Sequence, residues 1–182
     1  MSFLFKVVLI GDGEVGKTTL RKRFMGESFS TSYIPTIGAD FAVKDLKTKS
    51  GTQVRFQIWD LAGQQRFRVV REGFYRGSKG ALLIYDVTRG ETYNNIPAWA
   101  EELAKNVSVI PPMVLVGNKI DLKDQVPVYV SSDYGEMMRD YLEKRYRVPV
   151  KFIETSAKTG ENIEEAFVML AELILSQITN QG

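Results

Sequence analysis

The chain has 182 residues, which suits one folded unit with a substantial core, and we expect residues 1–182 to form a single domain. Its net charge of +2, with 25% charged residues, does not indicate a nucleic-acid-binding protein. Neither cysteine nor histidine is present, which excludes disulfides, thiol nucleophiles and imidazole chemistry. The start lacks a signal-peptide layout and no apolar run approaches the roughly 20 residues that span a bilayer, so we expect a soluble, cytoplasmic protein.

Apolar, β-rich runs alternate with helical patterns, which is typical of a mainly parallel sheet with helices on both faces. The sequence predicts strands at residues 7–10, 41–46, 54–60, 81–85, 113–116 and 148–153. A turn signal at residues 49–51 joins the second and third strands as a hairpin, which gives the sheet one antiparallel edge strand. The expected architecture is a three-layer α/β fold with six strands and about five helices.

The predicted helices separate these strands. The first occupies residues 19–24, and residues 61–79 have only weak helical character. Later helices are expected to be capped by Thr92, by Ser132 or Asp133, and by Asn162, which forms a capping box with Glu165. The inner faces of these three helices are expected to carry Ile96, Trp99 and Leu103, then Tyr134, Met138, Tyr141 and Leu142, then Ile163, Phe167, Leu170 and Ile174.

The segment between the first strand and the first helix is Gly11-Asp12-Gly13-Glu14-Val15-Gly16-Lys17-Thr18. Glycine, four residues and then Gly-Lys-Thr in a strand–loop–helix context is the spacing of a phosphate-binding loop. Backbone N–H groups close around phosphate oxygens there, and the helix presents its positive end. Lys17 would reach the β- and γ-phosphates and the Thr18 hydroxyl would bind Mg²⁺. The alternative is a simple glycine turn, and the loop alone does not select a base.

Polar residues follow the third, fifth and sixth predicted strands, where ligands bind in sheets of this kind. Asp60 is expected to hold Mg²⁺ through water, Gly63 to offer a backbone N–H, and Gln64 to orient a water. Alone, Asp60 is equally typical of a helix cap.

The tetrapeptides Asn118-Lys119-Ile120-Asp121 and Thr155-Ser156-Ala157-Lys158 suit guanine. Asp121 would accept from two N–H donors that adenine lacks, and Lys119 would cover the base with its methylenes. Asn118 is expected to tie this loop to the phosphate loop, and the Ala157 N–H to donate to the guanine oxygen. Either tetrapeptide alone is also compatible with an ordinary polar loop.

These motifs, together with Tyr33-Ile34-Pro35-Thr36-Ile37-Gly38, Trp59-Asp60-Leu61-Ala62-Gly63-Gln64-Gln65-Arg66-Phe67 and Tyr85-Asp86-Val87-Thr88, resemble the Ras superfamily of small GTPases, and within it the Rab branch. The resemblance covers essentially the whole chain and implies the phosphate-loop NTPase (Ras-like) fold. By resemblance, Thr36 is the switch threonine on Mg²⁺ and the γ-phosphate, Phe29 packs edge-on to the guanine, and Tyr33 folds over the phosphates. Phe41, Trp59 and Phe74 match an aromatic triad that contacts effectors, or are ordinary core residues.

The resemblance implies a switch that binds GTP and GDP with Mg²⁺ and hydrolyses GTP slowly, in trafficking or regulation at membranes. The expected catalytic residues are Gln64, Lys17 and Thr36, and the expected metal ligands are Thr18, Thr36 and Asp60. The expected nucleotide contacts are Gly13, Glu14, Val15, Gly16, Lys17, Thr18, Thr19, Phe29, Tyr33, Thr36, Gly63, Asn118, Lys119, Asp121, Ser156, Ala157 and Lys158. No arginine can be assigned as an internal finger, which predicts slow intrinsic turnover.

Effectors, exchange factors and activating proteins are expected to contact residues 31–40 and 64–79, Phe41 and Trp59, and the chain is expected to be a monomer. The basic stretch at 64–79 is either a solvated face or a surface for an acidic partner. Gln65 replaces the usual acidic residue, which puts the ordinary exchange mechanism in doubt. No prenylatable cysteine stands at the end, so either the sequence is truncated or the protein uses no prenyl anchor. Membrane contact, where it occurs, is expected through partners. The alternatives are a nucleotide-locked scaffold and another phosphate-loop enzyme, such as an ATPase or small-molecule kinase.

Overall fold

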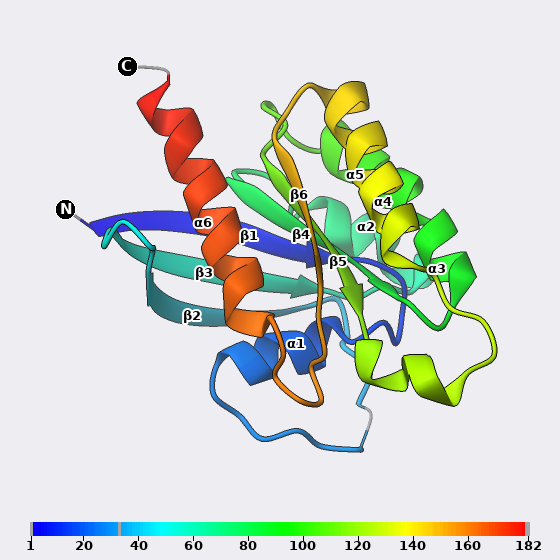
Figure 1. The fold of residues 1–182 in the computed structure, drawn as a ribbon. Coiled ribbons are helices and arrows are strands. Elements are labelled where there is room, and N and C mark those ends of the chain that lie inside the picture. Colours follow the sequence, from blue (N-terminus) through cyan, green and yellow to red (C-terminus); the bar gives the residue numbers. More distant parts are fainter. Residues whose placement is uncertain (1, 33, 181–182) are drawn as a thin grey trace.

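A six-stranded sheet forms the middle layer of the molecule (Figure 1). The computed structural model describes residues 2–32 and 34–180. The strands are β1 (Ser2–Ile10), β2 (Ala39–Lys47), β3 (Gln53–Leu61), β4 (Gly80–Asp86), β5 (Met113–Asn118) and β6 (Val150–Glu154), in the order β2-β3-β1-β4-β5-β6. β2 runs antiparallel to β3 and the other neighbours are parallel. The predicted mixed sheet with one antiparallel edge strand is confirmed.

The helices lie on both faces of this sheet. They are α1 (Lys17–Phe24), α2 (Arg68–Glu72), α3 (Gly90–Asn94), α4 (Ile96–Lys105), α5 (Ser132–Tyr146) and α6 (Ile163–Thr179). Short 3₁₀ turns cover Gln65–Phe67 and Ile120–Gln125. Helices α1 and α6 pack together on one face, and the other helices lie on the opposite face or along its edge (Figure 1).

The described residues form six α-helices where about five were expected, because one predicted helix is two. Pro97 stands at the start of α4, and a residue without a backbone N–H cannot continue the preceding α3. Thr92 therefore lies inside α3 and does not cap a helix. Its hydroxyl accepts from the Asp86 N–H at 2.9 Å and donates to the Arg89 carbonyl at 2.7 Å.

Two further capping predictions are wrong in detail. α5 begins at Ser132 with Ser131 as its N-cap, and neither Ser132 nor Asp133 caps it. Asn162 does precede α6, but in the left-handed conformation with a φ of 59°, and it donates its amide to the Glu154 carbonyl at 2.8 Å. Glu165 instead pairs with Lys49 from the β2–β3 turn at 2.8 Å, so no capping box forms.

Each sheet face has its own apolar core, because alternate strand residues point to opposite faces. Val7 and Leu9 pack toward α1 and α6, while Val8 and Ile10 pack toward α4 and α5. The Phe24 ring of α1 stacks on the Phe167 ring of α6 with centroids 3.8 Å apart. The expected inner faces of α4 and α6 are buried, but on α5 only Met138 and Leu142 are; Tyr134 and Tyr141 are exposed.

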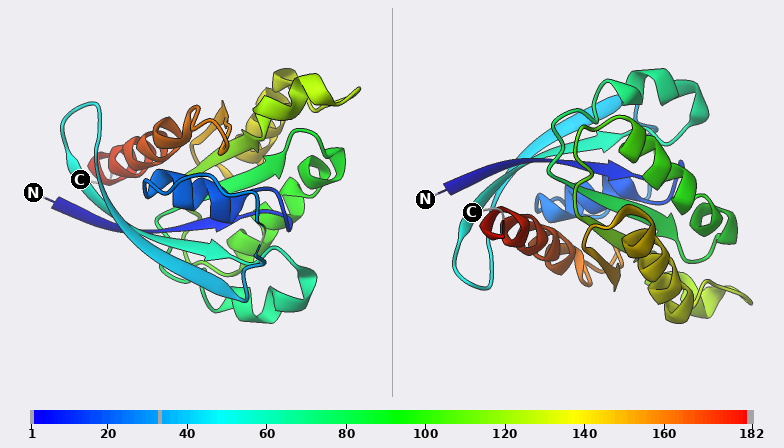
Figure 2. Two further views of the ribbon diagram at one scale, coloured as in Figure 1. Left: turned by 90° about the horizontal axis from the view of Figure 1, so that it is seen from below. Right: turned by 90° about the horizontal axis from the view of Figure 1, so that it is seen from above.

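The carboxyl ends of the parallel strands meet at one end of the molecule. Figure 2 shows β1 beginning and α6 ending on the opposite side from these strand ends. The loops that follow β1, β3, β4, β5 and β6 therefore converge, as the sequence predicted for its candidate residues. Within residues 2–32 and 34–180, no helix combines the length and apolar character needed to cross a membrane.

Candidate functional site

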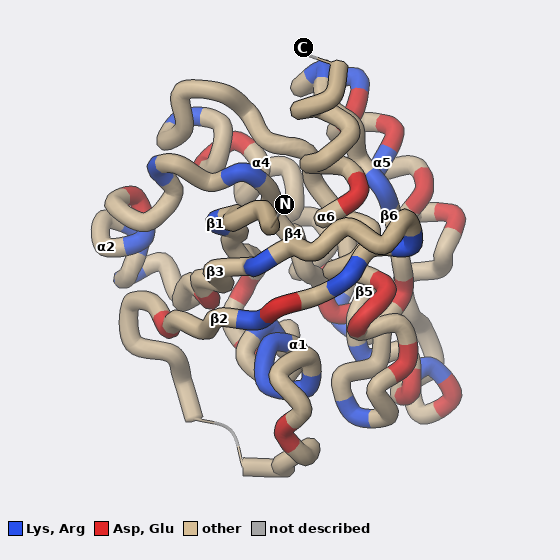
Figure 3. Tube along the Cα trace, turned by 90° about the vertical axis from the view of Figure 1, so that its left-hand side faces the viewer, with Lys and Arg blue, Asp and Glu red and all other residues tan. Residues whose placement is uncertain are grey.

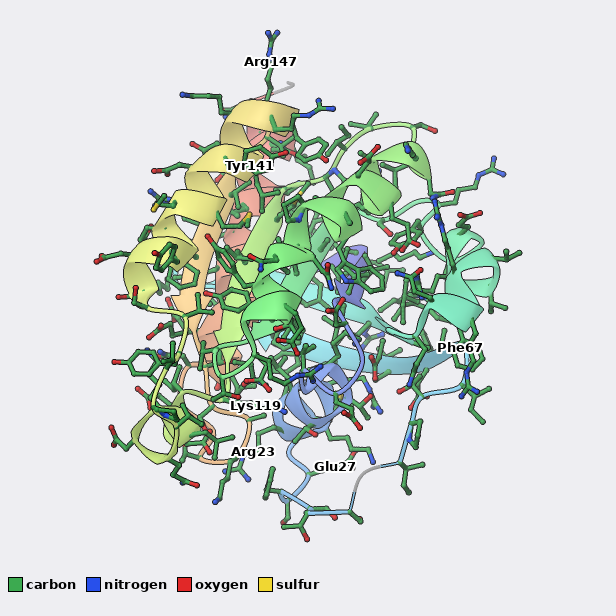
Figure 4. All side chains as sticks on the ribbon, turned by 90° about the vertical axis from the view of Figure 1, so that its right-hand side faces the viewer. Arg23, Glu27, Phe67, Lys119, Tyr141 and Arg147 are labelled. Atoms are coloured by element: carbon green, nitrogen blue, oxygen red, sulfur yellow. The ribbon has the colours of Figure 1, made fainter. Side chains whose placement is uncertain are left out.

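A cavity of about 540 Å³ opens where these strand ends converge. Its walls come from the loop before α1, the α1–β2 connection, and the loops after β3, β5 and β6. The predicted nucleotide contacts that line it are Gly13, Glu14, Gly16, Lys17, Thr18, Thr19, Phe29, Thr36, Gly63, Asn118, Lys119, Asp121, Ala157 and Lys158. Figure 4 shows Lys119, Arg23 and Glu27 near one another around α1. The sequence therefore anticipated most of the cavity's wall.

Three predicted contacts behave differently. Val15 and Ser156 are fully buried and are not among the residues that line the cavity. Each contacts a residue that lines the cavity: the Val15 carbonyl accepts a hydrogen bond from Asn118, and the Ser156 hydroxyl donates one to Asp121. Tyr33, expected to fold over the phosphates, lies outside the described residues.

The loop at residues 11–18 has positive φ angles at Gly11, Glu14 and Gly16, a conformation that favours glycine. Gly16 has a φ of 99°, and a Cβ there would run into the amide nitrogen of Asn118. Glu14 adopts a φ of 67° although it is not glycine. Such a backbone turns N–H groups inward, as a phosphate-binding loop requires.

Lys17 curls over this loop from the first turn of α1. Its ammonium donates to the carbonyls of Gly11 and Asp12, both at 2.8 Å. Burial lowers the pKa of Lys17 to about 8, against the opposing effect of the Asp60 and Asp12 carboxylates. Among the described residues this buried ammonium hydrogen-bonds only to neutral carbonyls, which makes it an electrostatic site for a polyanion.

Thr18, Thr36 and Asp60 gather oxygen atoms beside Lys17. The Thr18 and Thr36 hydroxyls lie 2.8 Å apart, and Thr18 also donates to Asp60 Oδ2. Asp60 is fully buried, and burial raises its pKa. Its other oxygen, Oδ1, is buried without a hydrogen-bond partner among the described residues. An orphaned carboxylate oxygen next to two hydroxyls is a donor set that suits a hard divalent cation.

The loop after β3 lies directly against the phosphate loop. A Cβ on Gly63 would be 2.5 Å from Asp12 C, Gly11 O and Gly13 N, so this position accepts only glycine in this arrangement. The Gln64 carboxamide faces Gly13, because a Cβ built on Gly13 would lie 3.8 Å from both the carboxamide carbon and the carboxamide nitrogen of Gln64. Gln64, which the sequence predicts to orient a water, is thus at the phosphate end of the cavity.

The opposite end is built around Asn118 at the end of β5. Its amide donates to the Val15 carbonyl at 3.0 Å, and its oxygen accepts from the Thr155 hydroxyl at 2.9 Å and the Ala157 N–H at 3.3 Å. Asn118 therefore ties the phosphate loop to both loops of the base end, as the sequence predicted.

Lys119 and Asp121 complete the base end of the cavity. Lys119 has a φ of 69° and donates to the Glu14 carbonyl at 2.7 Å, and its ammonium lies 3.0 Å from Asp86. Asp121 accepts from the Ser156 hydroxyl at 2.6 Å. The sequence analysis named Asp86 only within a motif and gave it no role at the site; its place at the end of β4 is the signal that indicates one.

Sequence reasoning also missed the residues that brace the outside of the phosphate loop. Trp99 Nε1 and Asn95 Nδ2 both donate to the Asp12 carboxylate at 2.7 Å. Arg89 Nη1 donates to the Gly13 carbonyl at 3.3 Å. These contacts join segments more than 70 residues apart, and only the fold brings them together.

The arginines of the 64–79 stretch do not form one surface. Figure 3 shows basic residues around α2. Arg66 stacks on Phe67 with 4.8 Å between the guanidinium carbon and the ring centroid, and Arg68 pairs with Glu72 at 3.3 Å. Arg71, by contrast, is 1% exposed and pairs with Glu102 at 2.8 Å. Counting Arg71 as part of a solvated or partner-binding face was therefore wrong, because its charge is buried and compensated.

The three aromatic side chains proposed as a triad lie together. The Phe41 and Trp59 ring centroids are 4.7 Å apart, and those of Trp59 and Phe74 are 5.1 Å apart. Phe41 is 44% exposed and the other two are partly buried, so the cluster reaches the surface. It is contiguous, as a docking surface requires, and it is not an enclosed part of the core.

Comparison with known proteins finds a match to the Ras family over residues 6–176. Among curated proteins, the chain is 39% identical over 180 residues to the Ras-related protein Rab-8B of Homo sapiens, covering 98% of this chain and 82% of that one. It is 40% identical over 177 residues to the Ras-related protein RABE1e of Arabidopsis thaliana, with 97% and 78% covered. It is 42% identical over 175 residues to the GTP-binding protein ypt2 of Schizosaccharomyces pombe, with 96% and 83% covered.

Proposed function

The chain belongs to the Ras family, and we propose on that basis that it is a Rab-like switch protein that binds GTP and GDP with Mg²⁺ and hydrolyses GTP to GDP and phosphate. The observation that carries this proposal is one cavity with opposite chemistries at its two ends. Lys17 and backbone N–H groups suit phosphates at one end, and the Asp121 carboxylate suits the paired N–H donors of guanine at the other.

Direct hydrogen bonds fix the distance between the base end and the phosphate end of the cavity. Asn118 and Lys119, from the base end, donate to carbonyls of Val15 and Glu14 in the phosphate loop at 3.0 and 2.7 Å. A nucleotide that satisfies Asp121 therefore meets the phosphate loop at a set distance. This geometry favours a guanine nucleotide over an unrelated phosphate compound.

The residues around Asp60 fit Mg²⁺. No group of three or more carboxylates, histidines or cysteines in the described part of the chain forms a metal cage. The Thr18 and Thr36 hydroxyls and Asp60 would hold the ion, Asp60 through water, and phosphate and water oxygens would complete its ligands. When bound, Mg²⁺ neutralises charge on the β- and γ-phosphate oxygens.

Hydrolysis in this site depends on positioning and charge. Gln64 and the Thr36 carbonyl hold a water in line with the γ-phosphate, and Lys17 stabilises charge that develops on the β–γ bridge. Ras itself turns over at roughly 10⁻⁴ s⁻¹ without an activating protein, and we expect the same order here.

The arginines near the site support slow turnover. Arg23 lines the cavity, but it lies beside Gly160, where a Cβ would be 3.2 Å from its Nη2, at the base end. Arg21, Arg71 and Arg89 are held by Asp40, Glu102 and Glu91. Arg21 and Arg71 are thus committed to carboxylates away from the phosphates, and Arg89 contacts the phosphate loop at the Gly13 carbonyl.

The output of the switch is a change in two loops. Loss of the γ-phosphate would release Thr36 and Gly63, which relaxes residues 31–40 and the 64–79 stretch. Effectors, exchange factors and activating proteins would read these segments with the Phe41–Trp59–Phe74 cluster, in trafficking or regulation at membranes. We place the protein in the cytoplasm, brought to membranes by partners.

The test begins with the nucleotide that copurifies with the protein. Heat-denatured protein should release GDP or GTP on chromatography, and added GDP should raise the melting temperature in magnesium. Preloaded GTP should then be hydrolysed in a single turnover. Release of adenine nucleotides would instead favour another phosphate-loop enzyme, and bound GTP that is never hydrolysed would favour a nucleotide-locked scaffold.

A further inference from the structure

Arg71 uses its whole guanidinium group inside the protein. Nε and Nη2 donate to the two carboxylate oxygens of Glu102 at 3.1 and 2.8 Å. Nη1 donates to the backbone carbonyls of Ala62 and Gln64 at 2.9 and 2.7 Å. Two-pronged pairing of this kind fixes the guanidinium plane as well as its position.

The two carbonyls held by Arg71 lie on either side of Gly63. That glycine packs against the backbone of Gly11, Asp12 and Gly13, with no room for a Cβ. The backbone that carries the Gln64 side chain is therefore held between the phosphate loop and Arg71. A shift of Arg71 would move Gln64 relative to the phosphates, and the one expected nucleotide contact that moves with it is Gly63, which meets the γ-phosphate of GTP and has no partner in GDP.

Helix α4 holds Arg71 in this place. Besides Glu102, α4 supplies Trp99, whose ring centroid lies 4.4 Å from the Arg71 guanidinium carbon. Tyr75 donates its hydroxyl to Glu102 as well. Trp99 also donates its indole N–H to Asp12 in the phosphate loop at 2.7 Å. One helix thus contacts the phosphate loop directly and the Gln64 backbone through Arg71.

A need for stability does not explain this arrangement. A buried ion pair is weak evidence for stability, because desolvating two charges offsets their attraction and apolar replacements are often neutral or stabilising. Hydrogen bonds to two specific carbonyls add geometric constraint that an apolar side chain cannot supply. The contacts point to a role in geometry.

We propose that Arg71 is a positioning residue for GTP hydrolysis: held by Glu102 and Trp99, it sets the Ala62–Gln64 backbone so that the Gln64 side chain meets the attacking water. This inference rests on the proposed function and adds a residue to it. Arg71 is buried and is not among the residues that line the cavity, so it acts only through Gln64. Its removal therefore affects hydrolysis and leaves nucleotide binding nearly unchanged.

The test variant combines Arg71→Met with Glu102→Gln, which removes both buried charges and leaves Tyr75 an acceptor. Single-turnover hydrolysis of preloaded GTP should slow by roughly 10- to 100-fold, the cost of misplacing a reacting group by about 1 Å. The GDP dissociation rate should change by less than about threefold, because no binding contact is lost. Arg76→Met, at an exposed arginine of the same segment, is the matched control and should hydrolyse GTP at the wild-type rate.

A double-mutant cycle with Gln64→Ala shows whether Arg71 acts through Gln64. Adding the Arg71/Glu102 changes to Gln64→Ala should cause no further loss of hydrolysis. A multiplicative loss, or a wild-type rate in the Arg71/Glu102 variant, would overturn the proposal. If that variant does not fold, Arg71→Lys in the same cycle replaces it, because a lysine keeps the charge beside Glu102 but cannot hold Glu102 and both carbonyls in one plane; the expectation and the refutation are the same.

The proposed function itself is checked by separate arms of this experiment. Wild-type protein that binds no guanine nucleotide, or a Gln64→Ala variant as fast as wild type, would overturn the broader proposal. Normal wild-type activity with a slow Gln64→Ala variant and an unaffected Arg71/Glu102 variant would overturn the positioning role alone.

Discussion

The hydroxyl of Ser156 donates to Oδ1 of Asp121 at 2.6 Å, and this bond connects the loops after β6 and β5 at the base end of the cavity. Ser156 is fully buried, whereas Asp121 lines the cavity. The bond restricts the rotation of the carboxylate and leaves its remaining acceptor sites for a ligand. Asp121 is thus oriented before any nucleotide arrives.

The first prediction concerns base selection. Asp121→Asn should lower GDP affinity by at least about 100-fold, the loss of two charge-assisted hydrogen bonds at about 1.5 kcal/mol each. It should raise affinity for xanthosine diphosphate, whose exocyclic oxygen accepts from the new amide. Competition binding of the two nucleotides measures the preference. Ser156→Ala, which removes only the orienting bond, should weaken GDP binding by less than about tenfold and keep the guanine preference; an unchanged preference in Asp121→Asn would contradict this assignment.

Most of the cavity wall was predictable because each binding segment is short, contiguous and placed at a strand end. The phosphate loop binds through its backbone, so glycine spacing alone reveals it. The strand order brings the loops after β1, β3, β5 and β6 to one end, and parallel topology requires this. Residues such as Lys17 and Asp121 could therefore be predicted from local motifs, without knowledge of tertiary contacts.

The braces behind the wall were not predictable for the opposite reason. Arg71 and Glu102 are 31 residues apart, and nothing local distinguishes a buried arginine from the exposed ones near it. The same holds for Trp99, which reads as core from its helical spacing and yet donates to Asp12. Pairing between distant polar groups depends on packing, and a single sequence carries no signal of it.

The second prediction concerns the charge on the phosphate loop. Glu14 is exposed and lines the cavity, and its carboxylate has no ion-pair partner among the described residues. The Glu14 carboxylate repels the negatively charged phosphates of a bound nucleotide. Two unit charges about 4 Å apart in water repel by about 1 kcal/mol. Because Glu14→Gln removes this repulsion, it should slow GDP release by roughly fivefold. Fluorescent GDP displacement measures this rate. The gain should shrink in high salt, and Glu14→Asp, which keeps the charge, should release GDP at nearly the wild-type rate; a faster release from Glu14→Gln would refute the argument.

The third prediction concerns an unsatisfied hydroxyl in the core. The Tyr85 hydroxyl is buried without a hydrogen-bond partner among the described residues and packs against Gly117. Tyr85→Phe should raise the free energy of unfolding by about 1 kcal/mol and the melting temperature by about 2–4 °C. Calorimetry at pH 7 measures both, and a drop in melting temperature would show that the hydroxyl has a partner in solution.

The same substitution has a pH dependence with a definite sign. Burial raises the pKa of Tyr85 above its ordinary value. The unfolded chain then loses this proton first, at about pH 10, so wild-type stability falls as the pH rises above that value. The advantage of Tyr85→Phe should therefore grow above about pH 10. Tyr141→Phe, at an exposed tyrosine, is the control and should leave the melting temperature at pH 7 unchanged.

The last prediction concerns magnesium removal. Chelation by EDTA should speed GDP release from the wild-type protein at least about tenfold, which corresponds to about 1.4 kcal/mol of lost interaction. Asp60→Asn should release GDP quickly with or without EDTA, because the neutral amide no longer attracts the ion at the buried Oδ1 position. Asp40→Asn makes the same chemical change at an exposed carboxylate that pairs with Arg21 at 2.8 Å, and it should keep the full response to EDTA. An Asp60→Asn protein that still responds tenfold would place the magnesium ion elsewhere, since the response depends only on where the cation is held.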